Sequence, residues 1–262
     1  MNLTQKHILL TGASRGIGLA LAEQCAQRKA HLHLVSRKLD PSLVQELGRL
    51  GAASVTLWPF DLSQTSEVER LVQNLHDKNI SIDVLINNAG LLTGGILEEQ
   101  DPDDIDKMLN VNVHALIRLT HRLLPGMLKR KQGLIVNNAS VSGKMFFPCA
   151  STYAASKAAV VAFTECLKQE VRGTGVATVL MITPGVKTEM FDDISKLYGK
   201  HLDVSFLSHI PVEEWAARVV KAMENGTDIV WPQGASYLGV KLAHHCPSVF
   251  EKLVRSKFNR FL

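Results

Sequence analysis

The sequence predicts an α/β fold built on a doubly wound, mainly parallel sheet with helices on both faces. The chain has 262 residues, 46% of them hydrophobic, which is ample for one large core. Short apolar runs alternate along it with longer segments of helical pattern. A glycine-rich turn directly follows the first apolar run and opens a helix. Strands that are apolar on both sides and separated by helices form parallel sheets covered on both faces.

Seven of the apolar runs are predicted to be strands. The pair Asp101-Pro102 predicts a helix start, because aspartate favours the N-cap and proline the first turn. No repeat or linker divides the sequence, so residues 1–262 are expected to form a single domain, with about 233–262 as a helical extension. Binding sites in such sheets lie beyond the carboxyl ends of the strands. The predicted strands are 7–11, 31–36, 54–60, 82–87, 133–139, 176–183 and 227–231.

Charge, hydropathy and cysteine spacing exclude several classes of protein. Residues 241–262 hold five Lys or Arg against one Glu, so this segment carries the whole net charge of +4. The neutral remainder argues against nucleic acid binding. No apolar run is long enough to span a membrane, and the N-terminus lacks a secretory pattern. The four cysteines lie far apart, which predicts reduced thiols and a cytoplasmic protein. The pair His244-His245 is expected in a loop, and no metal site is predicted.

The segment "TGASRGIG" at 11–18 has the composition of a phosphate-binding turn. Gly12 permits a tight turn between the first strand and the helix. Gly16 and Gly18 let the backbone and the helix approach a pyrophosphate, whose charge is favoured by the helix N-terminus. A structural glycine loop is the alternative, although the strand before and the helix after it favour a dinucleotide site.

The end of the second strand predicts which dinucleotide is bound. NAD sites usually place an Asp or Glu there to hold the ribose hydroxyls. This chain has Ser36-Arg37-Lys38 instead, and Arg15 lies in the glycine turn. Two guanidinium groups and a hydroxyl suit a 2′-phosphate, so NADP(H) is predicted over NAD(H).

Tyr153 and Lys157 stand four residues apart in "STYAASKAAV". That spacing places both side chains on one face of a helix. The small residues between them either let another helix pack closely or leave a pocket open above the pair. Taken alone, the pair is also typical of a helix surface with a solvated lysine.

Together these motifs resemble the short-chain dehydrogenase/reductase family. The resemblance spans about residues 5–232 and implies a Rossmann-type sheet of seven strands and an NADP-dependent oxidoreductase that interconverts a carbonyl and a secondary alcohol. A catalytically idle regulatory or scaffold protein is the alternative, but such a protein is expected to lose Tyr153 or Lys157. The motifs are "TGASRGIG", Asp61, "NNAG" at 87–90, Asn112, Ser140, Tyr153, Lys157 and "PGVKT" at 184–188, in the family's order.

The resemblance implies catalytic roles for four residues. Tyr153 is expected to be the general acid in reduction and the base in oxidation. Because a phenol titrates near 10, Lys157 is expected to lower the pKa of Tyr153 and to hold the nicotinamide ribose. Ser140 is expected to hold the substrate oxygen as charge develops there. Asn112 is expected to connect Lys157 to solvent through water.

The resemblance also implies the residues that hold the cofactor. Asp61 is expected near the adenine ring, Thr188 at the nicotinamide carboxamide, and "NNAG" beside the adenine ribose. A helix N-cap region is the alternative for Asp61. The full set is Gly12, Ser14, Arg15, Gly16, Ile17, Gly18, Ser36, Arg37, Asp61, Leu62, Asn88, Ala89, Gly90, Tyr153, Lys157, Pro184, Gly185, Val186 and Thr188.

Substrate choice is expected to depend on residues 141–150 and 189–212. Both segments are rich in large apolar side chains, which predicts a hydrophobic small molecule, such as a steroid-like or acyl-derived carbonyl or alcohol. Packing of a lid onto the core is the alternative. The expected substrate-binding residues are Ser140, Phe146, Phe147, Tyr153, Met190 and Phe191.

The tail runs about 30 residues beyond the last strand, unlike the oxoacyl-carrier-protein reductases of the family, which usually end soon after it. A helix docked over the substrate cleft or on a second subunit is expected, with a membrane-surface helix as the alternative. The family often dimerises through the helix of Tyr153 and the one before it, which implies a homodimer or homotetramer. Apolar residues at helical spacing in the tail are Phe250, Leu253, Val254, Phe258 and Phe261.

Overall fold

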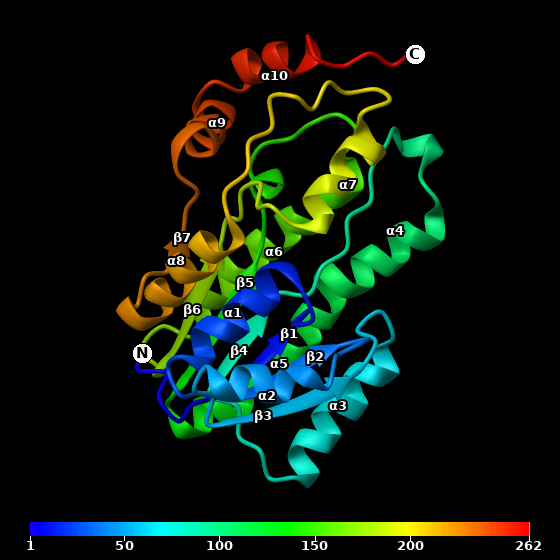
Figure 1. The fold of residues 1–262 in the computed structure, drawn as a ribbon. Helices are drawn as coiled ribbons and strands as arrows, with labels where there is room; N and C mark the ends of the chain where they lie inside the picture. The colour runs from blue at the N-terminus through cyan, green and yellow to red at the C-terminus, as the bar shows by residue number, and fades with distance from the viewer. Residues whose placement is uncertain (262) are drawn as a thin grey trace.

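The computed structural model describes residues 1–261 and contains one parallel sheet of seven strands in the order β3-β2-β1-β4-β5-β6-β7 (Figure 1). The predicted fold class and the position of every predicted strand are confirmed, although most strands end a residue or two earlier than expected. The strands are β1 (His7–Thr11), β2 (His31–Ser36), β3 (Ser54–Pro59), β4 (Val84–Asn87), β5 (Gly133–Asn138), β6 (Val176–Met181) and β7 (Ile229–Val230).

Helices connect successive strands, as parallel pairing requires. The start predicted at Asp101-Pro102 is confirmed, because the Asp101 side chain accepts a hydrogen bond from the Asp103 backbone N–H. The helices are α1 (Gly16–Ala26), α2 (Ser42–Arg49), α3 (Thr65–Asp77), α4 (Pro102–Leu109), α5 (Leu116–Arg130), α6 (Ser151–Glu170), α7 (Glu189–Tyr198), α8 (Val212–Asn225), α9 (Gly234–His245) and α10 (Pro247–Arg255). Short turns are η1 (Leu97–Glu99), the π-helical η2 (Asn110–Ala115) and η3 (Val141–Gly143).

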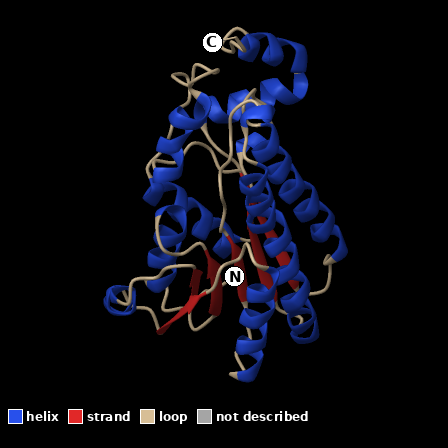
Figure 2. Cartoon of the chain, turned by 90° about the vertical axis from the view of Figure 1, so that its right-hand side faces the viewer, coloured by secondary structure: helices blue, strands red, loops and turns tan. Residues whose placement is uncertain are grey.

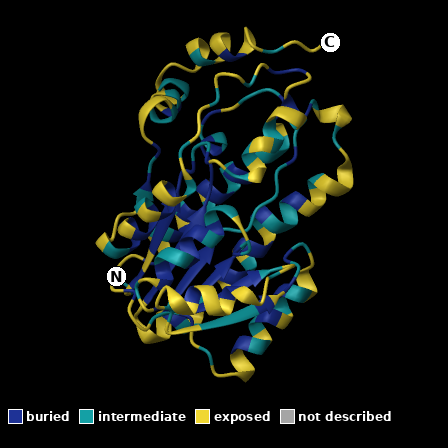
Figure 3. Cartoon of the chain, in the orientation of Figure 1, coloured by how far each residue is buried: buried dark blue, intermediate teal, exposed yellow. Residues whose placement is uncertain are grey.

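Helices lie on both faces of the sheet (Figure 2), and each face carries an apolar core. On one face α1, α2 and α8 pack on the strands, with Leu21 and Trp215 fully buried. On the other face α3, α5 and α6 cover the sheet through residues such as Leu71 and Leu119. Figure 3 shows the central strands buried between these helices, whereas the edge strand β3 is mostly half-buried.

The strand order reverses between β1 and β4, and this is the switch point at which such sheets bind ligands. Side chains tie the strand ends together there. The Asn88 amide donates to the carbonyl of Thr11 at 3.1 Å. The Asn138 amide donates to the Asn88 amide oxygen at 2.9 Å, and the Thr183 hydroxyl donates to the Asn138 amide oxygen at 2.6 Å. These bonds fix the carboxyl edge of β1, β4, β5 and β6.

The C-terminal extension forms two helices, α9 and α10, which lie beyond the carboxyl ends of the strands at the top of Figure 1. The structure corrects two expectations for it. His244 and His245 end α9 and do not lie in a loop. Phe258 and Phe261 lie beyond the last helix, where Phe258 pairs with Leu202 in an antiparallel bridge and Phe261 is 91% exposed. Among residues 1–261, no helix is long and apolar enough to cross a membrane.

Candidate active site

One cavity of about 1700 Å³ runs along the carboxyl edge of the sheet, from the glycine turn past α6 to α10. Every residue that the sequence predicted for the cofactor lies along it. A single ligand pocket usually measures about 300–1,000 Å³, so this cavity has room for two ligands side by side. The predicted substrate residues Ser140, Phe147, Met190 and Phe191 also line it.

The glycine turn leaves space that side chains would fill. Gly12 has a φ of +68°, and a Cβ there would lie 2.8 Å from the Cα of Ala89. A Cβ on Gly18 would lie 2.0 Å from the carbonyl oxygen of Gly12. No side chain caps the N-terminus of α1, so its first N–H groups stay available to an anion. The turn therefore fits a dinucleotide pyrophosphate.

The end of β2 supplies a hydroxyl and two cations to the same cavity. The Ser36 hydroxyl donates to the Ser14 hydroxyl at 3.0 Å, and Arg37 and Lys38 line the cavity beside them. Arg15 lines the cavity as well, and its guanidinium pairs with the Glu189 carboxylate at the start of α7. Both side chains of that pair are exposed, so water weakens the pairing.

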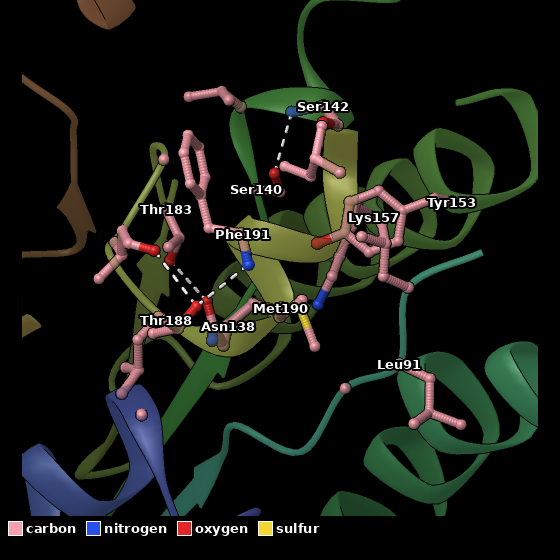
Figure 4. A pocket seen from close by; sticks show the side chains of 18 of the residues that line it. Leu91, Asn138, Ser140, Ser142, Tyr153, Lys157, Thr183, Thr188, Met190 and Phe191 are labelled. Atoms are coloured by element: carbon pink, nitrogen blue, oxygen red, sulfur yellow. Dashed lines mark hydrogen bonds between the residues drawn. The ribbon is translucent and has the colours of Figure 1, made fainter. Parts of the chain in front are cut away.

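Tyr153 and Lys157 both extend from α6 into the cavity (Figure 4). Lys157 is only 4% exposed, and its ammonium donates to the backbone carbonyl of Asn138 at 2.9 Å. Burial lowers the pKa of Lys157 to about 8.

The expected lowering of the Tyr153 pKa is wrong for this structure. Burial raises the pKa of Tyr153 to about 12, and the Ser140 hydroxyl opposes only part of that rise. Lys157 does not oppose this rise, because with a pKa of about 8 it has already lost its charge at the pH where Tyr153 titrates. In this arrangement Tyr153 is protonated at neutral pH, so its phenolic O–H is available as a hydrogen-bond and proton donor.

Ser140 and Thr188 occupy the cavity wall as helix caps (Figure 4). The Ser140 hydroxyl accepts from the Ser142 backbone N–H at 3.1 Å and is 8% exposed. Thr188 begins α7 by accepting from the Phe191 backbone N–H at 3.4 Å. Each hydroxyl still has a proton or lone pair for a ligand.

Asn112 does not line the cavity. It is 1% exposed within η2, accepts from the Leu91 backbone N–H at 2.8 Å and donates to the Leu91 carbonyl at 3.0 Å. A Cβ on Gly90 would lie 3.4 Å from the Asn112 amide oxygen and 3.6 Å from the Lys157 ammonium. Asn112 therefore lies behind the backbone at Gly90, close to Lys157. Its bonds to Leu91 hold the backbone that lines the cavity, but its side chain cannot contact a substrate.

Asp61 stabilises a turn before α3 and also lines the cavity, whereas the N-cap residue of α3 is Gln64. The Asp61 carboxylate accepts from the Ser63 backbone N–H at 2.9 Å in the turn before α3. The same residue lines the cavity, next to Leu62.

The apolar end of the cavity corrects one predicted substrate contact. Phe147 lines the cavity, whereas Phe146 is 63% exposed and lies outside it. The buried Tyr198 and Leu202, from the segment 189–212 that was expected to set substrate choice, also line this end. Nor was Asn138 foreseen, although two asparagines at the end of a buried strand were a visible signal.

Comparisons with known proteins agree with this geometry. A family model described as short chain dehydrogenase matches residues 6–198. Ketoacyl reductase HetN of Nostoc sp. is 38% identical over 229 residues, which cover 86% of this chain and 77% of that protein. The 3-oxoacyl-(acyl-carrier-protein) reductase FabG of Vibrio harveyi is 32% identical over 214 residues, which cover 80% of this chain and 84% of that protein.

A solved structure extends the likeness over the tail. The short-chain dehydrogenase from Sphingobium yanoikuyae in complex with NADPH is 26% identical, with a TM-score of 0.74 and 98% of both chains covered. The family model spans the glycine turn, Ser140, Tyr153 and Lys157. The chain therefore belongs to the short-chain dehydrogenase/reductase family and is an oxidoreductase of that family.

Proposed function

We propose that this protein uses NADP(H) to interconvert an apolar ketone and its secondary alcohol. One observation carries the proposal: a single cavity joins the glycine turn, the side chains of Ser140, Tyr153 and Lys157, and a wall of large apolar residues. A dinucleotide on the turn and an apolar substrate beyond Tyr153 would share that cavity.

Each side chain has one task in the reduction. When held at the glycine turn, a nicotinamide dinucleotide would supply the hydride that the carbonyl carbon receives. Tyr153 passes its phenolic proton to the carbonyl oxygen, which receives the electron pair of the broken π bond. The Ser140 hydroxyl donates to that oxygen as its charge develops. The Lys157 ammonium stabilises the phenolate that remains, and solvent then restores its proton.

The preference for NADP(H) is supported by charge at the end of β2. Arg37 and Lys38 are exposed cations that line the cavity, and no carboxylate stands beside Ser36. An Arg side chain can hold a 2′-phosphate through two parallel hydrogen bonds. The relative from Sphingobium yanoikuyae was solved with NADPH.

The choice of an apolar substrate is supported by the cavity wall beyond Tyr153. Met145, Phe147 and Phe191 line this part of the cavity. The two curated relatives described above are named as reductases of ketoacyl and oxoacyl groups. An acyl-derived or steroid-like ketone fits both observations.

NADPH oxidation and NADP reduction across a panel of ketones and alcohols test this function. Turnover of apolar ketones with a preference for NADPH is expected. Turnover restricted to small polar carbonyls would contradict the substrate class, and a preference for NADH would contradict the cofactor.

Assembly is part of the proposal. Ile117 and Leu128 are large apolar residues on α5 that are 37% and 36% exposed. A second copy packed on α5 and α6 would cover them, in a homodimer or homotetramer. Light scattering after size exclusion measures the mass directly, and a monomer at every concentration would overturn this assignment.

A further inference from the structure

Three phenylalanine rings from separate parts of the chain meet at the end of the cavity farthest from the glycine turn. The rings of Phe147 and Phe250 have centroids 5.5 Å apart, with their planes at 64°. The rings of Phe147 and Phe206 have centroids 5.9 Å apart. All three residues line the cavity, so the aromatic cluster joins α10 to the segment that follows Ser140.

The extension also packs closely on that segment through α9. A Cβ on Gly239 would lie 3.3 Å from the sulfur of Met145, so α9 packs closely against the Met145 side chain. Val240 is 4% exposed and packs in the cluster that contains Val141 and Met145. The first helix of the extension is therefore built onto the wall beside Ser140.

The far end of the extension is fastened to the loop that follows α7. The Asp203 backbone N–H donates to the Lys257 carbonyl at 2.9 Å, and the Asn259 N–H donates to the His201 carbonyl at 2.8 Å. The Lys257 ammonium lies 3.0 Å from the Asp203 carboxylate. The loop and the extension consequently form one continuous cover over the cavity.

Large apolar side chains on the inner surface of this cover remain exposed to the cavity. Leu253 and Phe206 line the cavity and yet are 55% and 42% exposed. Large apolar side chains that face a cavity in this way mark a surface that a ligand can bury. The Lys257 charge nearby is already neutralised by Asp203. An apolar group, and not a charged one, suits this end of the site.

We infer that the C-terminal extension supplies the distal wall of the substrate site, and that Phe250 determines how well a long apolar substituent binds. This inference rests on the proposed function and extends it. The reacting carbonyl lies by Tyr153, and the substituent extends from it toward Phe147 and Phe250. Short ketones do not reach Phe250, so they do not depend on it.

Reduction of methyl ketones from butanone to dodecanone by the full-length chain tests the inference. Phe250→Ala is expected to lower kcat/KM for dodecanone by about tenfold and to change that for butanone by less than about twofold. The matched control is Leu238→Ala, because Leu238 lies on α9, is 68% exposed and does not line the cavity. It is expected to change neither value. An equal loss for both ketones in Phe250→Ala, or no loss for either, would overturn the inference.

A second variant and a second readout separate this inference from misfolding and from the proposed function. Phe250→Trp places a larger side chain in the distal wall and so leaves less space there. The longest ketone that this variant reduces is therefore expected to be shorter than for the wild type. Binding of the apolar dye Nile red, followed by its fluorescence, needs no turnover and is expected to weaken in Phe250→Ala but not in Leu238→Ala. Phe250-dependent dye binding without ketone reduction would contradict only the proposed function. Ketone reduction with an unchanged length preference in both Phe250 variants would contradict only this inference.

Discussion

The ammonium of Lys157 donates to the backbone carbonyl of Asn138 across 2.9 Å, which ties a buried cation on α6 to the end of β5. The side chain of Asn138 is itself held by Asn88 and Thr183. The position of the lysine is therefore set by the strand ends and not by its helix neighbour Tyr153. A buried cation with a single neutral partner destabilises the folded state, and the cost follows from the pKa of Lys157.

Removal of this cation is expected to stabilise the protein. The Lys157 pKa is about 8 when folded against 10.5 in the reference state, so at pH 7 its charge costs the folded state on the order of 3 kcal/mol. Lys157→Met keeps the bulk of the side chain and leaves one Asn138 carbonyl without its partner. We expect a net gain of about 1–3 kcal/mol in the free energy of unfolding, measured with urea at pH 7.

The matched control for this measurement is Lys129→Met, since Lys129 is exposed on α5. It is expected to change stability by less than about 0.5 kcal/mol. Because the unfolded chain binds more protons than the folded one between pH 8 and 10.5, Lys157 also makes wild-type stability rise across that range. If Lys157→Met instead lowers the free energy of unfolding, the buried charge of Lys157 does not destabilise the folded state.

The rate of ketone reduction is expected to fall above about pH 8. Tyr153, with a pKa of about 12, keeps its proton through the neutral range, so the donor itself does not titrate there. Lys157, with a pKa of about 8, loses the charge that stabilises the phenolate. The profile of kcat/KM should be flat below pH 7 and decline on the alkaline side. In Lys157→Arg the cation persists, so the decline should disappear even if the rate is lower. An unchanged decline in that variant would assign the titration to another group.

Acid is expected to destabilise the protein through a histidine buried in the sheet. His33 is 3% exposed, lies 3.0 Å from His7 through their ring nitrogens, and accepts from the Trp58 indole N–H at 3.4 Å. That acceptor role keeps the ring neutral, and burial lowers the pKa of His33 to about 4. The unfolded chain binds a proton near pH 6.5, so stability is full above 6.5 and falls by about 3 kcal/mol as the pH approaches 4.

Urea unfolding at several pH values between 7.5 and 4.5 measures this loss. His33→Gln can still accept from Trp58 but does not titrate, so its stability should depend less on pH than that of the wild type. His121 is exposed on α5, and His121→Gln should keep the wild-type dependence. Identical pH dependence in both variants would exclude His33 as the group responsible.

Arg37 is expected to distinguish the two nicotinamide dinucleotides. Its side chain is exposed at the end of β2 and lines the cavity. Arg37→Ala should lower kcat/KM for NADPH by about tenfold, because a charge-assisted bond to phosphate is lost, and should leave the value for NADH within about twofold. Arg49→Ala is the control for loss of a surface charge, because Arg49 is exposed on α2 and does not line the cavity. If Arg37→Ala lowers kcat/KM equally for NADPH and NADH, Arg37 does not bind the 2′-phosphate.

The sequence predicted the sheet well because each strand is a short apolar run bounded by polar or glycine residues. The glycine turn after the first strand and the helix that carries Tyr153 and Lys157 were both predicted to contribute to one site at the carboxyl edge of the sheet, and both line the cavity there. Local pattern could not decide which of Phe146 and Phe147 faces the cavity. The chain after them turns through Cys149, which has a φ of +67° that its residue type does not predict.

Two further features depend on contacts between distant segments. The apolar spacing in the tail continues through Phe258, but the helix ends at Arg255 because Phe258 pairs with Leu202. The pKa of Tyr153 follows from how deeply its side chain is buried, which a four-residue spacing does not encode.

Replacement of Tyr153 by phenylalanine removes one oxygen atom and leaves the cavity almost unchanged in shape. If Tyr153 donates the proton, Tyr153→Phe lowers kcat for NADPH-dependent ketone reduction by at least about a hundredfold. The dissociation constant for NADPH, followed by its fluorescence, should stay within about threefold of the wild type, because the glycine turn and β2 are intact. Reduction by Tyr153→Phe at the wild-type rate, with NADPH bound equally well, would show that the proton comes from another group.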